Sequence, residues 1–364
     1  MPDSPSITQL AALVQALPQE EQQRFQRIFH VDSVVGELRA PPAMHAWIER
    51  HFGSLEAVQQ QRIVKVTNLI TVEGALFNAL RGRRPAGAKD TADLEQTIRN
   101  SRGDAFCRPL EATPEDAFGR VQGQHCITAA NVAKYDGLCS VVIFDEHNPL
   151  VFGPEQVKDY FDTALSWARQ AHCVDKEAVY FFLLWNCLWR SGSSVLHGHA
   201  QMSLGRGMHY AKVERLRRAA LLYRIGHGVN YFDDLYAVHK ALGLAVDDGP
   251  VRILAHLTPL KDKEVILMAP RLDDDLKRAI HKALRVYIDQ LGVRSFNLAL
   301  HLRPIDGVPE DWKGFPAQVR IVDRGDPQDR ASDMGAMDLY GSSVVASDPF
   351  DVAQALRRAF GGGE

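Results

Sequence analysis

The sequence predicts an α+β protein in which helices pack on antiparallel sheets, with a helical segment in front. Two observations lead to this prediction. Short apolar runs rich in β-branched and aromatic residues alternate with amphipathic helical patterns, and this alternation occurs twice along the chain. A chain of 364 residues that is 46% hydrophobic can bury a large core in two units. We therefore expect a helical extension over residues 1–60, a first half over 61–207 and a similar second half over 208–364.

The first sixty residues are predicted to be helical. Leu10, Val14 and Leu17 recur near helical spacing, and a second apolar group follows at 25–29. The pair Pro41–Pro42 interrupts the pattern. We interpret this region as an accessory segment that precedes the two halves.

Strands are predicted from Val64 onward in the first half. The runs 139–144 and 178–185 are short and almost entirely apolar, which is typical of buried strands. A helix is expected between them, starting after Gly153. Pro154 suits a first helical turn, and apolar residues then recur at helical spacing.

The second half repeats the alternation more weakly. Its patterns predict, in order, a helix over 213–223, strands over 251–256 and 265–268, a helix over 273–291, strands over 296–302 and 342–346, and a helix from Asp348. The Asp-Pro pair at 348–349 is a favourable helix start, because aspartate caps a helix and proline fits its first turn. No long linker separates the halves, so we expect them to pack together.

The composition excludes several classes of protein. A formal net charge of −3 provides no basic field for nucleic acid. No apolar run approaches the roughly 20 residues of a membrane span, and the first residues lack the pattern of a signal peptide. Five cysteines without paired spacing favour free thiols. We expect a cytoplasmic protein that binds neither nucleic acid nor membranes.

The most informative motif is His197-Gly198-His199-Ala200-Gln201, in which two imidazoles and an amide recur at every second residue. On a strand these three side chains share one face, and the small residues between them can pack on a core. A histidine can attack phosphorus and form a phosphoramidate when its neighbours orient the ring and neutralise the phosphoryl oxygens. We predict that His199 is the nucleophile and that Gln201 donates a hydrogen bond to a phosphate oxygen.

Residues around the motif extend this predicted site. Gly192, Ser193 and Ser194 form a small approach rich in hydrogen-bond donors. His197 has two candidate roles, since it can bind the phosphate or ligate a metal that holds the strand. A bare H-x-H pair is often a chance repeat, but the glutamine and the Ser/Gly approach favour a functional site.

Together these residues resemble the galactose-1-phosphate uridylyltransferase branch of the histidine-triad superfamily. Asn186, Gly192 and Ser194 stand at the offsets that the family shows before its first histidine. The resemblance covers residues 64–205 well and the remainder loosely. It implies a fold of two histidine-triad-like halves, of which the first is catalytic.

Three further positions resemble substrate contacts of that family. In the segment 78–85, Arg81 and Arg84 match arginines that contact the substrate phosphates, and Asn131 resembles an asparagine that contacts the nucleotide. Short arginine runs are often solvated surface clusters. No glycine-rich phosphate loop occurs elsewhere in this chain, however, so we predict phosphate contact here.

The resemblance also implies a structural zinc site. The corresponding positions are Asp104, Cys107, His147 and His197, with aspartate in place of the family's first cysteine. Carboxylate, thiolate and imidazole groups can together bind zinc tetrahedrally. The alternative is that Cys107 is an ordinary buried thiol and His147 a turn residue.

The activity implied by the resemblance is nucleotidyl transfer through a covalent nucleotidyl-histidine. His199 would take a nucleoside monophosphate, expected to be UMP, from a nucleotide sugar, with Ser194 supporting the phosphate. The acceptor would be a sugar 1-phosphate or phosphate. Galactose is not expected, because only His301 stands where the family has a C-terminal histidine cluster. The alternatives are a dinucleoside polyphosphate phosphorylase or hydrolase and a non-catalytic nucleotide-binding protein. The family further implies a homodimer.

Overall fold

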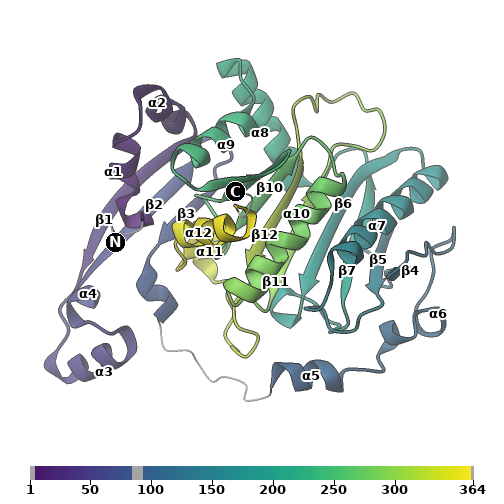
Figure 1. The fold of residues 1–364 in the computed structure, drawn as a ribbon, viewed down its shortest axis with the longest axis horizontal. Coiled ribbons are helices and arrows are strands. Elements are labelled where there is room, and N and C mark those ends of the chain that lie inside the picture. The colour runs from purple at the N-terminus through teal and green to yellow at the C-terminus, as the bar shows by residue number, and fades with distance from the viewer. Residues whose placement is uncertain (1–4, 84–92, 362–364) are drawn as a thin grey trace.

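A nine-stranded antiparallel sheet forms the centre of the protein (Figure 1). The computed structural model describes residues 5–83 and 93–361. Across the sheet the strands are β4 (Cys126–Ala130), β5 (Leu138–Phe144), β7 (His199–Arg206), β6 (Ala178–Cys187), β11 (Phe296–His301), β12 (Ala317–Asp323), β10 (Val265–Ala269), β9 (Val251–Ala255) and β8 (Ala245–Asp248).

Both halves of the chain contribute to this one sheet. They meet where β6 pairs with β11, in a register that places Asn186 opposite Asn297 and Phe182 opposite His301. The predicted α+β class is confirmed, because every strand pair in the large sheet is antiparallel and helices pack against it. The predicted halves therefore share a continuous sheet and are not two separately closed units.

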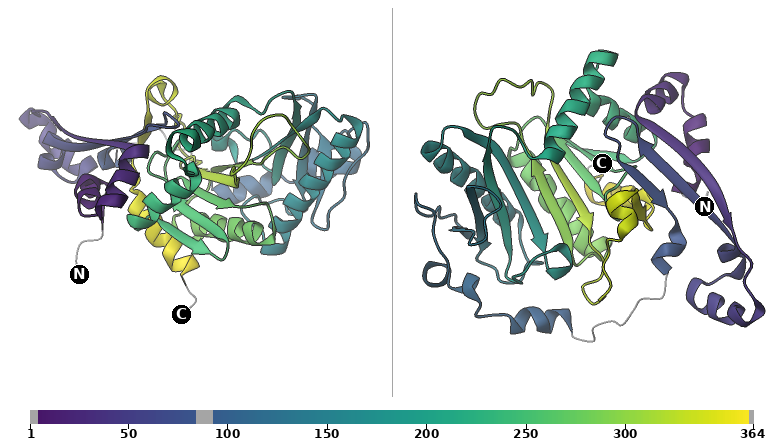
Figure 2. Two further views of the ribbon diagram at one scale, coloured as in Figure 1. Left: turned by 90° about the horizontal axis from the view of Figure 1, so that it is seen from above. Right: turned by 180° about the vertical axis from the view of Figure 1, so that it is seen from behind.

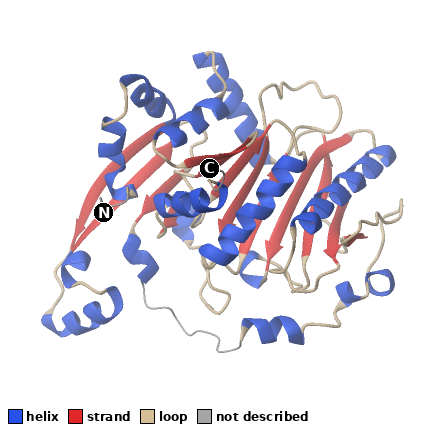
Figure 3. Cartoon of the chain, viewed as in Figure 1, coloured by secondary structure: helices blue, strands red, loops and turns tan. Residues whose placement is uncertain are grey.

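Two long helices cover one face of the sheet. Figure 3 shows α7 (Pro154–Val174) and α10 (Asp274–Arg285) in front of the strands, and the two helices also contact each other. Both begin as the sequence predicts, since Pro154 occupies the first turn of α7 and the side chain of Asp273 caps α10. On β7, Ala200 and Met202 are buried in the core that α7 covers. The alternate residues of β7 therefore lie on the face opposite the helices.

A second, four-stranded sheet contains much of the N-terminal region. Its order is β1 (Phe29–Glu37), β2 (Gln60–Asn68), β3 (Gly74–Phe77) and β13 (Ser343–Val345), and Figure 2 shows the β1–β2 hairpin projecting from the rest of the protein. The helices here are α1 (Leu10–Gln15), α2 (Gln19–Ile28), α3 (Pro42–Phe52) and α4 (Leu55–Gln59). The expectation that residues 1–60 are entirely helical is therefore wrong for β1. All nine residues of β1 pair with β2, three of them β-branched valines, and this long-range pairing outweighs the local helical pattern.

Shorter elements and the remaining helices connect these layers. They are η1 (Ile7–Gln9), η2 (Ala79–Arg83), α5 (Leu94–Asn100), η3 (Ala105–Cys107), α6 (Pro109–Ala112), η4 (Trp189–Ser191), α8 (Ala211–His227), α9 (Tyr231–Ala241), the π-helical turn η5 (Val286–Gln290), α11 (Ala336–Tyr340) and α12 (Pro349–Phe360). Asp348 caps α12, as its sequence predicts. None of the described helices has the length and apolar character that a membrane crossing requires.

A buried ionic group joins the two sheets. Arg320 on β12 lies 2.6 Å from a carboxylate oxygen of Glu264 and 3.0 Å from one of Glu73, which directly precedes β3. All three side chains are at most 11% exposed. Because an unpaired charge would be costly at this depth, the group holds the N-terminal sheet at one position against the large sheet.

Candidate active site

The strand that carries the histidine motif begins at His199. His199 and Gln201 lie on the face of β7 that is opposite the helices, as the two-residue period predicts. His197 precedes the strand, so the expectation that all three side chains stand on one strand is corrected for this residue. Gly198 pairs irregularly instead: its N–H donates to the carbonyl of His147, and its carbonyl accepts from the N–H of Phe144.

A backbone contact determines the tautomer of His199. Its Nδ1 lies 2.8 Å from the carbonyl oxygen of His197, and a carbonyl can only accept, so Nδ1 carries the proton. Nε2 then holds the lone pair. The ring of Phe106 packs edge-on against this imidazole at a centroid distance of 5.1 Å. Burial lowers the pKa of His199, which keeps the ring neutral near pH 7. A neutral, oriented imidazole is the form that can act as a nucleophile.

A largely apolar cavity of about 270 Å³ adjoins Gln201 on the same face. Gln201 ends in a buried amide oxygen that has no hydrogen-bond partner among the described residues. A half-turn about the last side-chain bond exchanges this oxygen for the NH2 group. Gln201 can therefore either accept a hydrogen bond from a ligand in the cavity or donate one to it. The cavity is lined by Tyr135, Phe182, Leu184, Gln201, Met202, Ser203 and Tyr210.

The approach to β7 is a tightly bonded turn. Gly192 adopts a positive φ of 95°, a conformation that favours glycine. The hydroxyl of Ser193 donates to the carbonyl of Val195 at 2.6 Å, whereas Ser194 is exposed. Of the two predicted serine donors, Ser194 is therefore the one that is accessible to a ligand.

Asn186 lies on β6, the strand next to β7. The register pairs Leu184 with Gln201, and continuing it by two residues places Asn186 opposite His199. Asn186 and His199 are therefore neighbours on the same face of the sheet. Contact between Asn186 and the substrate stays a prediction.

Asn131 stands farther from the nucleophile. It follows β4, and its N–H donates to the carbonyl of Cys139. Cys139 pairs with Ser203 on β7, four residues beyond His199, which corresponds to about 13 Å along the strand. The cavity beside Gln201 extends in this direction, because Ser203 lines it.

Arg81, one of the two predicted arginines, lies away from β7 in the single chain. Arg81 is in η2, which directly follows β3 of the four-stranded sheet. Figure 1 shows that sheet beyond the end of the large sheet that contains β10, whereas β7 lies near the other end. Arg84 lies outside the described residues. The fold therefore does not bring Arg81 onto β7 within one chain, and phosphate contact by these arginines stays a prediction.

The four predicted metal ligands converge. One ligand atom from each of Asp104, Cys107, His147 and His197 lies within 4.8 Å of the others. The two imidazole Nδ1 atoms are 3.1 Å apart, and the Cys107 sulfur is 3.4 Å from Nδ1 of His147 and 3.5 Å from that of His197. An Oδ1 atom of Asp104 is 3.5 Å from Nδ1 of His197. The four residues come from three separate segments, so this cluster is a product of the fold.

The surroundings of the cluster turn its donor atoms toward a common centre. Nε2 of His197 lies 2.7 Å from the carbonyl of Phe144, and Nε2 of His147 lies 3.0 Å from that of Ile98. Both Nε2 atoms must donate, so in the neutral rings both Nδ1 atoms present lone pairs to each other. Two facing lone pairs at 3.1 Å repel unless a cation lies near them. Hydrogen bonds of this kind from the outer ring nitrogen are typical of metal-bound histidines.

Two further observations fit a metal in this cluster. The buried Oδ2 of Asp104 has no hydrogen-bond partner among the described residues. The sulfur of Cys107 accepts the backbone N–H of Gly103 at 3.3 Å, so it lies within reach of the other three donor groups and is itself hydrogen-bonded. The residues present therefore match the tetrahedral O/S/N donor set that zinc accepts.

Some residues of the site were not predicted. Phe106 packs edge-on against both His197 and His199, at centroid distances of 6.1 and 5.1 Å, and so shapes the wall beside the nucleophile. It lies inside the segment that resembles a metal-binding loop, which was the available signal. The backbone carbonyls of Phe144 and Ile98 orient the rings of His197 and His147. Every residue has such a carbonyl, so the sequence could not indicate these two contacts.

Solved structures with a similar architecture were found, although no protein-family model matches the sequence and a comparison with curated proteins finds no match. An ADP-glucose phosphorylase from Arabidopsis thaliana aligns with a TM-score of 0.59 at 16% identity, covering 79% of this chain and 96% of that one. A GalT-like protein from the same plant aligns with a TM-score of 0.58 at 15% identity, covering 80% and 97%. A uridylyltransferase aligns with a TM-score of 0.57 at 15% identity, covering 81% and 98%.

These alignments span nearly the whole of each neighbour, so the likeness concerns the entire architecture and not a local motif. At 15–16% identity they establish the fold alone. They bear out the resemblance read from the histidine motif at that level. The chain has the fold that these phosphorylase and uridylyltransferase structures share.

Proposed function

We propose that this protein is a nucleotidyltransferase that moves a nucleoside monophosphate, UMP in the first instance, from a nucleotide sugar to a second phosphate-bearing acceptor. The acceptor is a sugar 1-phosphate or inorganic phosphate. The observation that carries the proposal is the geometry of His199. Its Nδ1 donates to the carbonyl of His197, so the ring is neutral and Nε2 carries a free lone pair. Asn186 and Gln201 flank this ring on the same face.

In the first step, Nε2 of His199 attacks the α-phosphorus of the nucleotide sugar. The N–P bond forms while the bond from the α-phosphorus to the bridging oxygen breaks, and a sugar 1-phosphate leaves with the electron pair. Charge spreads over the non-bridging oxygens during this displacement, so donors beside the ring accelerate it. Gln201 and Asn186 are the neutral donors that flank His199, and the exposed Ser194, in the turn before β7, is proposed as a third.

In the second step, a phosphate oxygen of the acceptor attacks the same phosphorus and breaks the N–P bond. The imidazole returns to its neutral form, with the proton still on Nδ1 of His199 and donated to the carbonyl of His197. Two displacements at one phosphorus predict ping-pong kinetics. An acceptor sugar phosphate yields a new nucleotide sugar, and inorganic phosphate yields a nucleoside diphosphate.

The cavity beside Gln201 supports a nucleotide as the transferred group. Tyr135, Phe182 and Leu184 line it together with Tyr210, and such walls suit the faces of a planar base. It begins beside Gln201, two residues along β7 from His199, and continues toward the level of Asn131. A nucleotide whose α-phosphate meets His199 would therefore extend its base along the open face of the sheet.

The cluster of Asp104, Cys107, His147 and His197 is proposed to hold a structural zinc ion. When bound, zinc would cross-link the 104–107 segment to the residues that lead into β7. The chain's own contribution is to fix the carbonyl of His197, the group that orients His199. Nε2 of His197 donates to the carbonyl of Phe144, which ties this orientation to β5.

The test is the intact mass of the protein after mixing with UDP-glucose, ADP-glucose or diadenosine tetraphosphate. His199→Ala is the key variant, and His227→Ala, an exposed histidine near the end of α8, is the matched control. We expect a uridylyl adduct in the wild type and in the control but not in His199→Ala. An adduct that persists in His199→Ala would overturn the proposed nucleophile. An adenylyl adduct would overturn UMP as the transferred group and favour a phosphorylase, and bound nucleotide without any adduct would overturn transfer altogether.

A further inference from the structure

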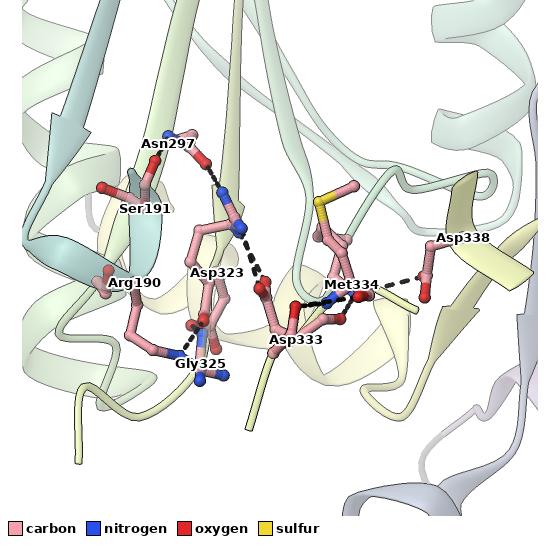
Figure 4. Close-up of polar contacts among 12 residues, drawn as sticks. Arg190, Ser191, Asn297, Asp323, Gly325, Asp333, Met334 and Asp338 are labelled. Atoms are coloured by element: carbon pink, nitrogen blue, oxygen red, sulfur yellow. Dashed lines mark hydrogen bonds and ion pairs between the residues drawn. The ribbon is translucent and has the colours of Figure 1, made fainter. Parts of the chain in front are cut away.

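The side-chain amide of Asn297 on β11 joins the two halves of the protein beside the proposed site (Figure 4). Its Nδ2 donates to the Oδ1 of Asn186 at 2.6 Å and to the backbone carbonyl of Ser191 at 2.9 Å. Its Oδ1 accepts from Nη1 of Arg324 at 2.5 Å. One amide therefore contacts β6, the turn before β7 and a residue just after β12.

The chemistry of these partners allows only one orientation of the Asn297 amide. A guanidinium only donates, so the group facing Arg324 must be the carbonyl oxygen. A backbone carbonyl only accepts, so the group facing Ser191 must be the NH2. A flipped amide would place a donor against Arg324 and an acceptor against the Ser191 carbonyl, and both hydrogen bonds would be lost.

This orientation in turn determines the orientation of Asn186. The NH2 of Asn297 requires an acceptor, so Asn186 must present its Oδ1 to β11. Asn186 lies between Asn297 on one neighbouring strand and His199 on the other. Its own NH2 is therefore directed away from β11 and toward β7, the strand that carries His199. A phosphate oxygen bound at His199 would need a hydrogen-bond donor there.

The far end of this chain of contacts is anchored by an ion pair. Arg324 donates to both carboxylate oxygens of Asp333, at 2.6 and 2.9 Å, in the bidentate geometry that fixes a guanidinium plane. The two side chains are only 16% and 15% exposed. Burial acts to raise the pKa of Asp333, but the hydrogen bonds and charge of Arg324 outweigh it and hold that pKa below its usual value.

The same segment of the second half also holds the turn before β7. Nε1 of Trp189 donates to the carbonyl of Pro327 at 2.9 Å, and Arg190 donates to the carbonyls of Arg324 and Asp329. These contacts are made by the two residues that directly precede Ser191, whose carbonyl Asn297 binds. Residues 324–329, which are far away in sequence, thus hold the turn that leads through Gly192–Ser194 into β7.

We propose that Asn297 is a positioning residue that orients the amide of Asn186, so that its NH2 donates to the phosphate transferred by His199. Arg324 and Asp333 set the orientation of Asn297 from the second half. This inference rests on the proposed nucleotidyl transfer and deepens it, because it assigns the second half a role in the chemistry of the first.

The decisive variant is Asn297→Asp, which keeps the size of the side chain and its contact with Arg324. A carboxylate cannot donate to Asn186, so the Asn186 amide should rotate, donate to Asp and turn its oxygen toward the phosphate. We expect adduct formation to slow by about 10- to 100-fold, the equivalent of one lost hydrogen bond to a charged group. The loss should fall mainly on kcat rather than KM, because charge on the phosphoryl oxygens grows in the transition state.

Two comparisons separate positioning from a general structural effect. In an Asn186→Ala background, Asn297→Asp should change the rate by less than about threefold, since no Asn186 amide is left to misorient. The serine side chain in Asn297→Ser is too short to reach Asn186 or Arg324. This variant should therefore lose less activity than Asn297→Asp. Equal loss with and without Asn186, at an unchanged free energy of unfolding, would overturn the proposal.

A second readout does not depend on turnover. In protein labelled with ¹⁵N-asparagine, the side-chain NH2 resonances of Asn186 are assigned by their loss in Asn186→Ala, and they should shift strongly in Asn297→Asp. Unchanged resonances would overturn the orientation of Asn186 by Asn297. If wild-type protein forms no adduct with any nucleotide sugar, the proposed function fails, and these resonances still decide whether Asn297 orients Asn186.

Discussion

Replacing Gly198 by alanine tests how closely the two histidines are fitted to the sheet. A Cβ atom at this position would lie 2.7 Å from Cδ2 of Phe144 and 3.1 Å from the backbone oxygen of Glu146. Ordinary contacts of this kind begin near 3.4 Å, so the phenyl ring or the motif would have to move by about 0.7 Å. The ring has little room, because it stacks on Tyr160 at a centroid distance of 3.7 Å and meets Trp185 edge-on at 4.9 Å.

The expected cost is about 1–3 kcal/mol of the free energy of unfolding, the usual range for forcing an extra group into a packed core. A second effect follows because the carbonyl of Phe144 accepts the hydrogen bond from Nε2 of His197. A displaced Phe144 would loosen that ring, and the loss of such an outer contact lowers metal affinity by about 10- to 100-fold in known metal sites. We therefore expect Gly198→Ala to weaken both folding and zinc binding.

Urea unfolding and zinc competition with a chelator measure these two quantities. Gly137→Ala is the matched control, because Gly137 is exposed and a Cβ there would meet nothing within 4 Å. The control should change the free energy of unfolding by less than about 0.5 kcal/mol. If Gly198→Ala were as stable as the control, the close packing of the motif against Phe144 would be refuted.

Three further outcomes are expected. Cys107→Ala should lower the bound zinc, measured by elemental analysis, from one equivalent toward none, whereas His199→Ala should retain it; equal zinc in both variants would contradict the proposed ligand set. Arg320→Met should cost about 3–5 kcal/mol in urea unfolding, because it leaves the buried carboxylate of Glu264 without its partner; a change below 1 kcal/mol would show that the carboxylate is already neutral. Because the folded pKa of Asp333 is depressed, its stabilising contribution is present above the unfolded pKa of about 3.9 and is lost as the pH falls through the folded value. The difference in unfolding free energy between wild type and Asp333→Asn should accordingly shrink below about pH 4, and a difference that stays constant down to pH 2 would argue against the ion pair.

Local patterns sufficed where one side of an element is apolar. The helix α7 was predicted from its proline start and its apolar spacing, and β5 and β6 from their continuous apolar runs. These elements are buried through apolar side chains of their own, so residue type alone identifies them. They also place the histidine motif between two buried strands.

Two strands, β12 and β1, were not predicted, because the groups that stabilise each of them lie elsewhere in the sequence. In β12, Gln318 and Arg320 interrupt the apolar pattern. Gln318 is nevertheless buried, and the Arg320 side chain is only 11% exposed because carboxylates from other parts of the chain neutralise it. β1 is largely exposed and is held by its pairing with β2. In neither case does the local sequence contain the compensating partner.

By itself the sequence determined which chemical groups are available and, through the two-residue period, that His199 and Gln201 face the same way. It also supplied the four candidate zinc ligands by their resemblance to a known pattern. Only the tertiary structure decided what these groups can do. The tautomer of His199 and the amide orientation of Asn186 depend on contacts with a backbone carbonyl and with Asn297 on another strand. Such contacts are directional and arise only when separate segments are packed together, so no residue type encodes them.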